Sequence, residues 1–102
     1  DANGESIMAS INMLPNTVAL KGNFPNPFNP ETSISYTLSH DSQVMLSVYD
    51  LSGRLVERLV NAEQYPGEFS VDWSANSLPS GMYIARLMVN GESFTQKMML
   101  MK

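Results

Sequence analysis

The side chains able to support catalysis are few in this chain, and they stand apart from one another. The single histidine, His40, lies in the segment SHDS beside Asp41. A serine or threonine nucleophile needs a base within hydrogen-bond reach and a third group that orients the base. A short polar turn instead exposes both of these side chains to water, so no catalytic arrangement is indicated. We therefore expect that the protein is not an enzyme.

The carboxylates are equally dispersed, in separate turns or on the outer faces of strands. Acid/base pairing is therefore not expected among Asp41, Asp50, Asp72 and Glu92. No loop has the alternating acids of an EF-hand, there is no glycine-rich phosphate loop, and the chain contains no cysteine for a thiolate site or a disulfide. No cofactor is expected. A calcium site built from loop acids and carbonyl oxygens stays open at this point.

The composition indicates one folded, acidic domain. The chain has 102 residues, a formal net charge of −4 and 43% hydrophobic residues. A chain of this length buries roughly 65% of its unfolded surface, which is enough for a core without disulfides. The scattered acids argue against nucleic-acid binding. The chain also has no apolar run of about 18 residues, so membrane insertion is not expected.

Alternation of apolar and polar residues predicts a series of short β-strands with one buried face each. The predicted strands cover residues 17–22, 32–38, 43–49, 54–60, 68–74, 82–89 and 92–101. Trp73 is expected at the centre of the core. Short strands at this spacing, separated by Gly, Pro and Asn turns, are typical of sandwiches. The predicted fold class is all-β, an Ig-like antiparallel Greek-key β-sandwich of about seven strands.

The connections carry conformational signals of their own. Asn90-Gly91 favours a type I′ hairpin turn, because both residues tolerate positive φ. Asp50 suits the first position of a type I turn, and Gly53 suits the left-handed residue that closes a bulged hairpin. Residues 61–67 are predicted to form a polar loop.

Two further segments have the character of rigid corners. Leu78, Pro79, Gly81 and Tyr83 form the pattern of a tyrosine corner, in which the phenol bonds back to upstream backbone. Residues 24–32 have the sequence FPNPFNPET, whose prolines predict a stiff, non-helical bend. The phenylalanines of this bend, Phe24 and Phe28, are expected to be anchors that press onto the core.

Methionine is frequent, with 8 residues. Met45, Met99 and Met101 fall on the strand face opposite the predicted core face. Because methionine adapts to irregular partners, a two-sided apolar strand near a sheet edge is suited to docking another protein. The alternatives are that this strand lies between neighbours, or that the lead-in segment covers it.

Four segments together resemble one known family. GNFPNPFNPETSISYTL, VYDLSGRLVERLV, LPSGMYIARL and KMMLMK occur in the order found in the type A C-terminal sorting domain of cargo proteins of the type IX (Por) secretion system of Bacteroidetes and relatives. The resemblance covers roughly residues 17–102, and residues 1–16 are expected to be a linker or weak edge strand from an upstream region. The nearest rival is the Ig-like domain of the flagellar hook-cap protein family. It implies a structural or adhesive module that stays attached and makes protein–protein contacts.

The resemblance implies a non-catalytic tail that the outer-membrane secretion machinery recognises in order to export an upstream cargo in the same chain through the periplasm. A sortase-like protease would remove the tail within residues 1–16 and leave the cargo anchored at the outer-membrane surface or released outside the cell. The recognition residues implied, together with the methionines discussed above, are Pro25, Asn26, Pro27, Phe28, Asn29, Pro30, Asp50, Gly53, Arg54, Leu78, Pro79, Gly81, Tyr83, Lys97, Met99, Met101 and Lys102.

Overall fold

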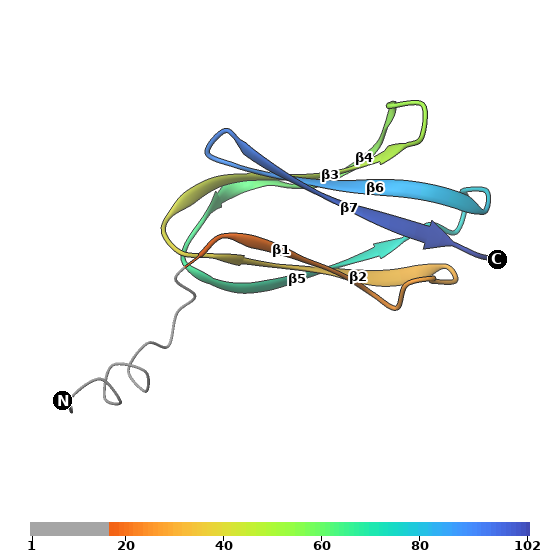
Figure 1. Ribbon diagram of the computed structural model, residues 1–102, viewed down its shortest axis with the longest axis horizontal. Helices are drawn as coiled ribbons and strands as arrows, with labels where there is room; N and C mark the ends of the chain where they lie inside the picture. Colours follow the sequence, from red (N-terminus) through yellow and green to blue (C-terminus); the bar gives the residue numbers. More distant parts are fainter. Residues whose placement is uncertain (1–16) are drawn as a thin grey trace.

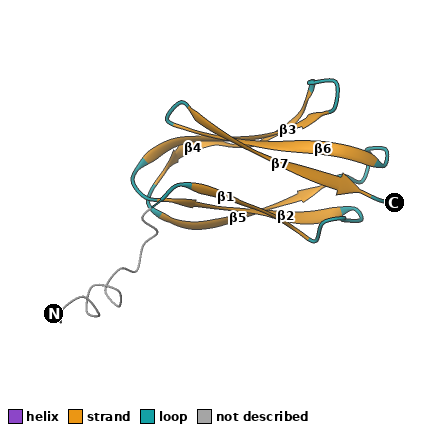
Figure 2. Cartoon of the chain, viewed as in Figure 1, coloured by secondary structure: helices purple, strands orange, loops and turns teal. Residues whose placement is uncertain are grey.

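The computed structural model describes residues 17–102, which form seven β-strands and contain no helix. The strands are β1 Ala19–Phe24, β2 Glu31–Leu38, β3 Ser42–Asp50, β4 Leu55–Gln64, β5 Gly67–Ser74, β6 Gly81–Val89 and β7 Glu92–Leu100 (Figure 2). The linker and cleavage predictions for residues 1–16 lie outside the described residues.

The strands form two sheets packed face to face (Figure 1). One sheet has the order β1-β2-β5 and the other the order β4-β3-β6-β7, with every pairing antiparallel. The pairs β2–β5 and β3–β6 join strands that are not consecutive, which is the crossover pattern of a Greek key. The predicted Ig-like antiparallel sandwich is therefore confirmed.

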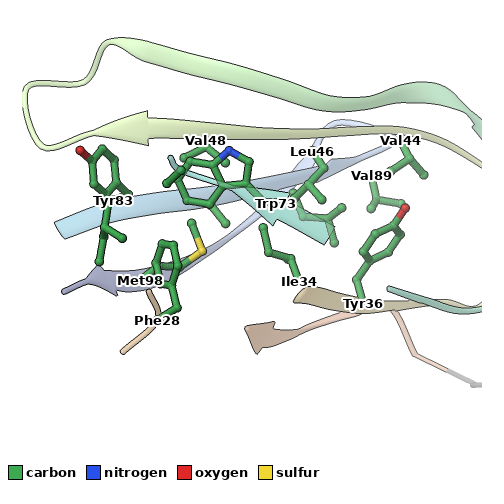
Figure 3. Close-up of a cluster of buried hydrophobic side chains, with 14 of the residues drawn as sticks. Phe28, Ile34, Tyr36, Val44, Leu46, Val48, Trp73, Tyr83, Val89 and Met98 are labelled. Carbon is green, nitrogen blue, oxygen red and sulfur yellow. The ribbon is translucent and has the colours of Figure 1, made fainter. Parts of the chain in front are cut away.

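The core lies between the sheets and is built mainly from the alternating residues of β2, β3 and β6, with Trp73 of β5 and Met98 and Leu100 of β7. Trp73 is only 2% exposed and packs beside two other rings, those of Phe28 and Tyr83 (Figure 3). Its ring centroid lies 5.6 Å from that of Phe28 and 5.9 Å from that of Tyr83. The indole N–H donates to Glu57 Oε1 at 3.1 Å, so the one polar atom of the ring is satisfied. The central place predicted for Trp73 is confirmed.

The polar loop predicted for residues 61–67 is wrong, because β4 continues to Gln64. Residues 61–64 pair with the first half of β3, and Gln64 Oε1 accepts a 2.6 Å hydrogen bond from the Tyr36 hydroxyl. β4 is an edge strand, so Asn61 and Glu63 are exposed to water while its backbone still pairs with β3. The prediction failed because it relied on side-chain polarity, whereas backbone hydrogen bonds to β3 hold these residues in a strand.

The expectation that Phe24 anchors the core is also wrong, whereas Phe28 is 2% exposed and does so. Phe24 is 82% exposed on the outer face of the three-stranded sheet. A bulge between Leu20 and Gly22 inserts one extra residue into β1, and Gly22 has a φ of 115°. One inserted residue reverses which side chains face the core, so Phe24 turns outward.

β1, β3, β5 and β7 all run in the same direction along the sandwich (Figure 1). The segments that follow these strands therefore lie at one end of the molecule. We call this the motif end and define it as residues 25–30, 51–54, 75–80 and 101–102. The opposite end, the turn end, contains residues 39–41, 65–66 and 90–91.

Candidate functional site

The motif end ties the last residues of the chain to segments far away in sequence. Phe28 N–H donates to the carbonyl of Met99 at 2.9 Å, and Met101 N–H donates to the carbonyl of Phe28 at 3.0 Å. On the other side, the Lys102 N–H donates to Ser80 Oγ at 2.9 Å, and its Nζ donates to the carbonyl of Asn76 at 2.6 Å. The end of β7 is thus held between the proline bend and the corner.

The side chain of Asn26 covers part of the free edge of β7. Its Oδ1 accepts from Met99 N–H at 3.0 Å, and its Nδ2 donates to the carbonyl of Lys97 at 3.2 Å. One amide therefore makes the two hydrogen bonds that a neighbouring strand would make. Together with Phe28 it occupies the backbone edge of β7 from Lys97 to Met101.

The predicted tyrosine corner is confirmed. The hydroxyl of Tyr83 donates to the carbonyl of Pro79 at 2.7 Å, and the ring is 5% exposed. Leu78 N–H donates to the carbonyl of Ala75 at 3.1 Å, which closes the turn before the corner. Gly81 begins β6 with a φ of 153°. These bonds hold the corner in one conformation beside β7.

Asp50 organises the turn that follows β3. Its Oδ1 accepts from the Ser52 hydroxyl at 2.6 Å, from Ser52 N–H at 2.9 Å and from Arg54 N–H at 3.0 Å. These bonds, the Ser52 hydroxyl first, lower the pKa of Asp50 to about 2, and the guanidinium of Arg54 adds an ion pair at 3.3 Å. Gly53 has a φ of 89°, as the predicted turn requires. The carboxylate is thus fully engaged inside its own turn.

Two groups can be distinguished among the predicted recognition residues. In the first group, Phe28 and Tyr83 are buried, and the polar side-chain atoms of Asn26 and Asp50 form hydrogen bonds within the domain. The members that expose their side chains are Pro25, Pro27, Asn29, Arg54, Pro79, Lys97, Met101 and Lys102. All but Lys97 of this exposed group lie at the motif end.

Sequence reasoning identified Met101 but missed Leu51 and Leu55 among the apolar side chains that protrude near this end. Among residues 17–102, the exposed large hydrophobics are Phe24, Leu51, Leu55, Tyr65 and Met101. Four of these five lie in or next to the motif end, and only Tyr65 lies at the turn end. For Leu51 a signal was present, because an apolar residue at the tip of a tight turn has no neighbours to cover it.

Residues 17–102 do not bring together a group of side chains for metal binding or for nucleophilic catalysis. No group of three or more histidine, cysteine or acidic side chains is placed to hold a metal ion in this range, which includes the loops left open for calcium. His40 is exposed, with its Nδ1 2.8 Å from Ser39 Oγ. The same residues contain no helix long and apolar enough to cross a membrane.

The comparisons with known proteins agree with this geometry. The model of the family described as "Secretion system C-terminal sorting domain" matches residues 23–101. The chain belongs to this family. It is a sorting signal of the type IX secretion system, which recognises such a domain and exports the protein that carries it. A comparison with curated proteins finds no match.

Two solved structures share the fold of this sorting domain. The crystal structure of dimeric latent PorU from Porphyromonas gingivalis matches with a TM-score of 0.60 and 24% identity, over 81% of this chain and 9% of that one. The structure of PorZ, a surface component of the type IX system of Porphyromonas gingivalis, matches with a TM-score of 0.52 and 20% identity, over 91% of this chain and 12% of that one. The sorting domain thus spans about a tenth of the length of each protein.

Proposed function

We propose that the motif end of this sorting domain is the surface that the type IX secretion machinery contacts. The observation that carries the proposal is the gathering of protruding apolar side chains at this end, with Leu51 69% exposed and Met101 57% exposed. Two cations, Arg54 and Lys102, lie beside them. Apolar anchors with charged neighbours are typical of protein–protein contacts.

The loops at this end support such a role because they are already ordered. Leu51 lies on a turn that Asp50 closes, and Met101 is held through its own N–H by Phe28. A partner that binds preorganised side chains does not have to order them first, which lowers the entropic cost of association. A rigid end of this kind presents the same surface whatever polypeptide is attached.

The direction of the chain suits the export of an upstream cargo. β1 begins at the turn end, so polypeptide joined ahead of it is attached opposite to the motif end (Figure 1). The motif end then stays accessible to the machinery. Removal of the domain by a sortase-like protease, with the cargo left at the outer-membrane surface or outside the cell, belongs to the same proposal and rests on the family resemblance.

Export of a reporter tests this proposal. Residues 1–102 are fused behind a fluorescent protein with an inner-membrane signal peptide, in a host that has a type IX system. We expect export of the wild-type fusion and its loss in the double variant L51D/M101D. The matched control is Y65D, because Tyr65 is 73% exposed at the turn end. Y65D should be exported normally.

Two outcomes would contradict the proposal. Periplasmic retention of the wild-type fusion would contradict the sorting role of the isolated domain, and normal export of L51D/M101D would show that the motif end is not the contact. Thermal unfolding of the purified domains checks that the variants are folded. Mass spectrometry of the exported reporter locates any proteolytic cleavage.

A further inference from the structure

We propose that the outer face of the four-stranded sheet is a docking surface for an acidic, apolar surface of a protein of the secretion machinery. This inference rests on the proposed function and extends it from the motif end along the length of β7. We call the surface the methionine face. It consists of Met45, Tyr49, Met82, Ile84, Met88 and Met99, with the cations Arg58, Arg86 and Lys97 among them and the acid Glu63 toward the turn end.

The backbone edge of β7 is closed to a partner over its last residues. Asn26 takes the hydrogen bonds of Met99 N–H and the Lys97 carbonyl, and Phe28 takes those of the Met99 carbonyl and Met101 N–H. A partner therefore has no backbone hydrogen bonds to gain here by adding a strand. What it can contact is the side chains that β7 presents outward, Lys97 and Met99.

These outward side chains lie beside outward apolar side chains of β6 and β3, which Arg86 interrupts. Met99 is the register partner of Met82, and Lys97 is the partner of Ile84. Further along the sheet, Met45 is the partner of Met88. The four methionines are half-buried, so their thioethers form part of a shallow, nearly continuous apolar surface. Flexible thioethers adapt to the shape of a partner at low cost.

The positive charges on this face determine which charge a partner surface should carry. Arg58 and Arg86 are both register partners of Ser47 and flank it on either side, and Arg58 Nε donates to Ser47 Oγ at 3.5 Å. Among residues 17–102 the only ion pair joins Arg54 to Asp50, so no described carboxylate neutralises these two guanidiniums. Carboxylates on a partner would form charge-assisted hydrogen bonds with these guanidiniums. An apolar surface between those carboxylates would pack against the methionines.

The outer face of the other sheet has the opposite character. It carries Glu31, Glu68 and Asp72 among serine hydroxyls, and Ser33 Oγ donates to Asp72 Oδ1 at 2.6 Å. A second copy of the chain can supply these acids to the methionine face, but it brings mainly hydroxyls against the thioethers, with Phe24 as an exposed large hydrophobic side chain. We therefore assign the face to a different protein, and self-association becomes an outcome of the test.

Charge reversal in the exported fusion tests the inference. We expect R58E/R86E to lower the export rate by about tenfold or more, because close interfacial charge pairs contribute at least that much to binding. The conservative variant R58K/R86K should retain most of the export. The matched control is E31K/E68K on the other sheet, which should leave the export rate unchanged. Equal thermal midpoints for the purified domains exclude a folding defect.

The outcomes separate this inference from the proposed function. Wild-type export together with undiminished export of R58E/R86E overturns the inference and leaves the sorting role intact, whereas failure of the wild-type fusion overturns both. A photo-crosslinker in place of Met88 should couple to a protein of the export machinery through a segment rich in Asp and Glu, and one in place of Ser70 should not. Coupling to a basic segment, or a wild-type dimer in sedimentation that R58E/R86E abolishes, overturns the inference.

Discussion

The two ends of this sandwich are built in different ways. At the turn end, the connections have only two or three residues, as at Asn90-Gly91, where the two residues have φ values of 49° and 92°. At the motif end, longer segments are tied to the last residues of the chain by hydrogen bonds between residues far apart in sequence, such as Asn26 to Met99 and Lys102 to Asn76. The difference teaches that much of the family pattern maintains the fold around the last strand, and that only its exposed members remain for a partner.

The largest expected effect is on the aromatic cluster near the motif end. Trp73→Ala should lower the free energy of unfolding by about 3–5 kcal/mol, because it removes a fully buried ring that contacts Phe28 and Tyr83. Tyr65→Ala, at the turn end, should change it by less than about 0.5 kcal/mol. Urea denaturation followed by circular dichroism measures both. A change below about 1 kcal/mol for Trp73→Ala would place the ring outside the core.

The next largest effect is expected from the Asn26 side chain, which covers the free edge of β7. Asn26→Ala removes two hydrogen bonds to β7 and should lower the free energy of unfolding by about 1–2 kcal/mol. The amide of Met99 should then exchange with deuterium faster than in the wild type. Asn29 is an exposed asparagine of the same bend with no side-chain hydrogen bond within residues 17–102, so Asn29→Ala is the matched control. Equal exchange rates of the Met99 amide in the two variants would show that Asn26 does not protect the edge of β7.

The tyrosine corner should contribute slightly less. Tyr83→Phe keeps the ring but removes the 2.7 Å hydrogen bond to Pro79, so the free energy of unfolding should fall by about 1 kcal/mol. Tyr49→Phe serves as the control, because no hydrogen bond of the Tyr49 hydroxyl occurs within residues 17–102. If both variants unfold at the same denaturant concentration, the corner bond adds nothing to stability.

The smallest expected effect depends on pH. The pKa of Asp50 in the folded protein is lowered to about 2 from its ordinary 3.8, so its contribution to stability is complete above pH 4. That contribution is lost as the pH falls from about 4 to about 2, because the carboxyl becomes protonated. Asp50→Asn should remove this part of the pH dependence of the thermal midpoint. If the thermal midpoints of the wild type and Asp50→Asn depend on pH in the same way between about pH 4 and pH 2, Asp50 does not make this contribution.

Most strands and turns were predictable, because their signals are local. Alternation identified the inward faces of β2 and β3, and the corner of Tyr83 was visible in a few consecutive residues. The failures concern residues whose side chains mislead. Phe24 is apolar but exposed because a bulge reverses its face, and residues 61–64 are polar but form strand because β3 pairs with them.

The candidate site was predictable only in part. The family resemblance named Asn26 and Lys97, and the methionine pattern named Met99, but nothing in the sequence indicated that the side chain of Asn26 would close the edge of β7. The clustering of Leu51 and Met101 at one end was likewise hidden. Both depend on which strands run side by side, and pairing partners lie far apart in the chain.

The amino-acid sequence by itself determined the strand periods, the turn conformations and the choice of Trp73 as the core residue, because steric limits on φ and the pleat of a strand act over a few residues. Only the tertiary structure decided the strand order, the outward turn of Phe24 and the gathering of Arg58, Arg86 and Lys97 on the methionine face. These features depend on long-range backbone pairing, which many sequences satisfy in the same way and which no short segment specifies alone.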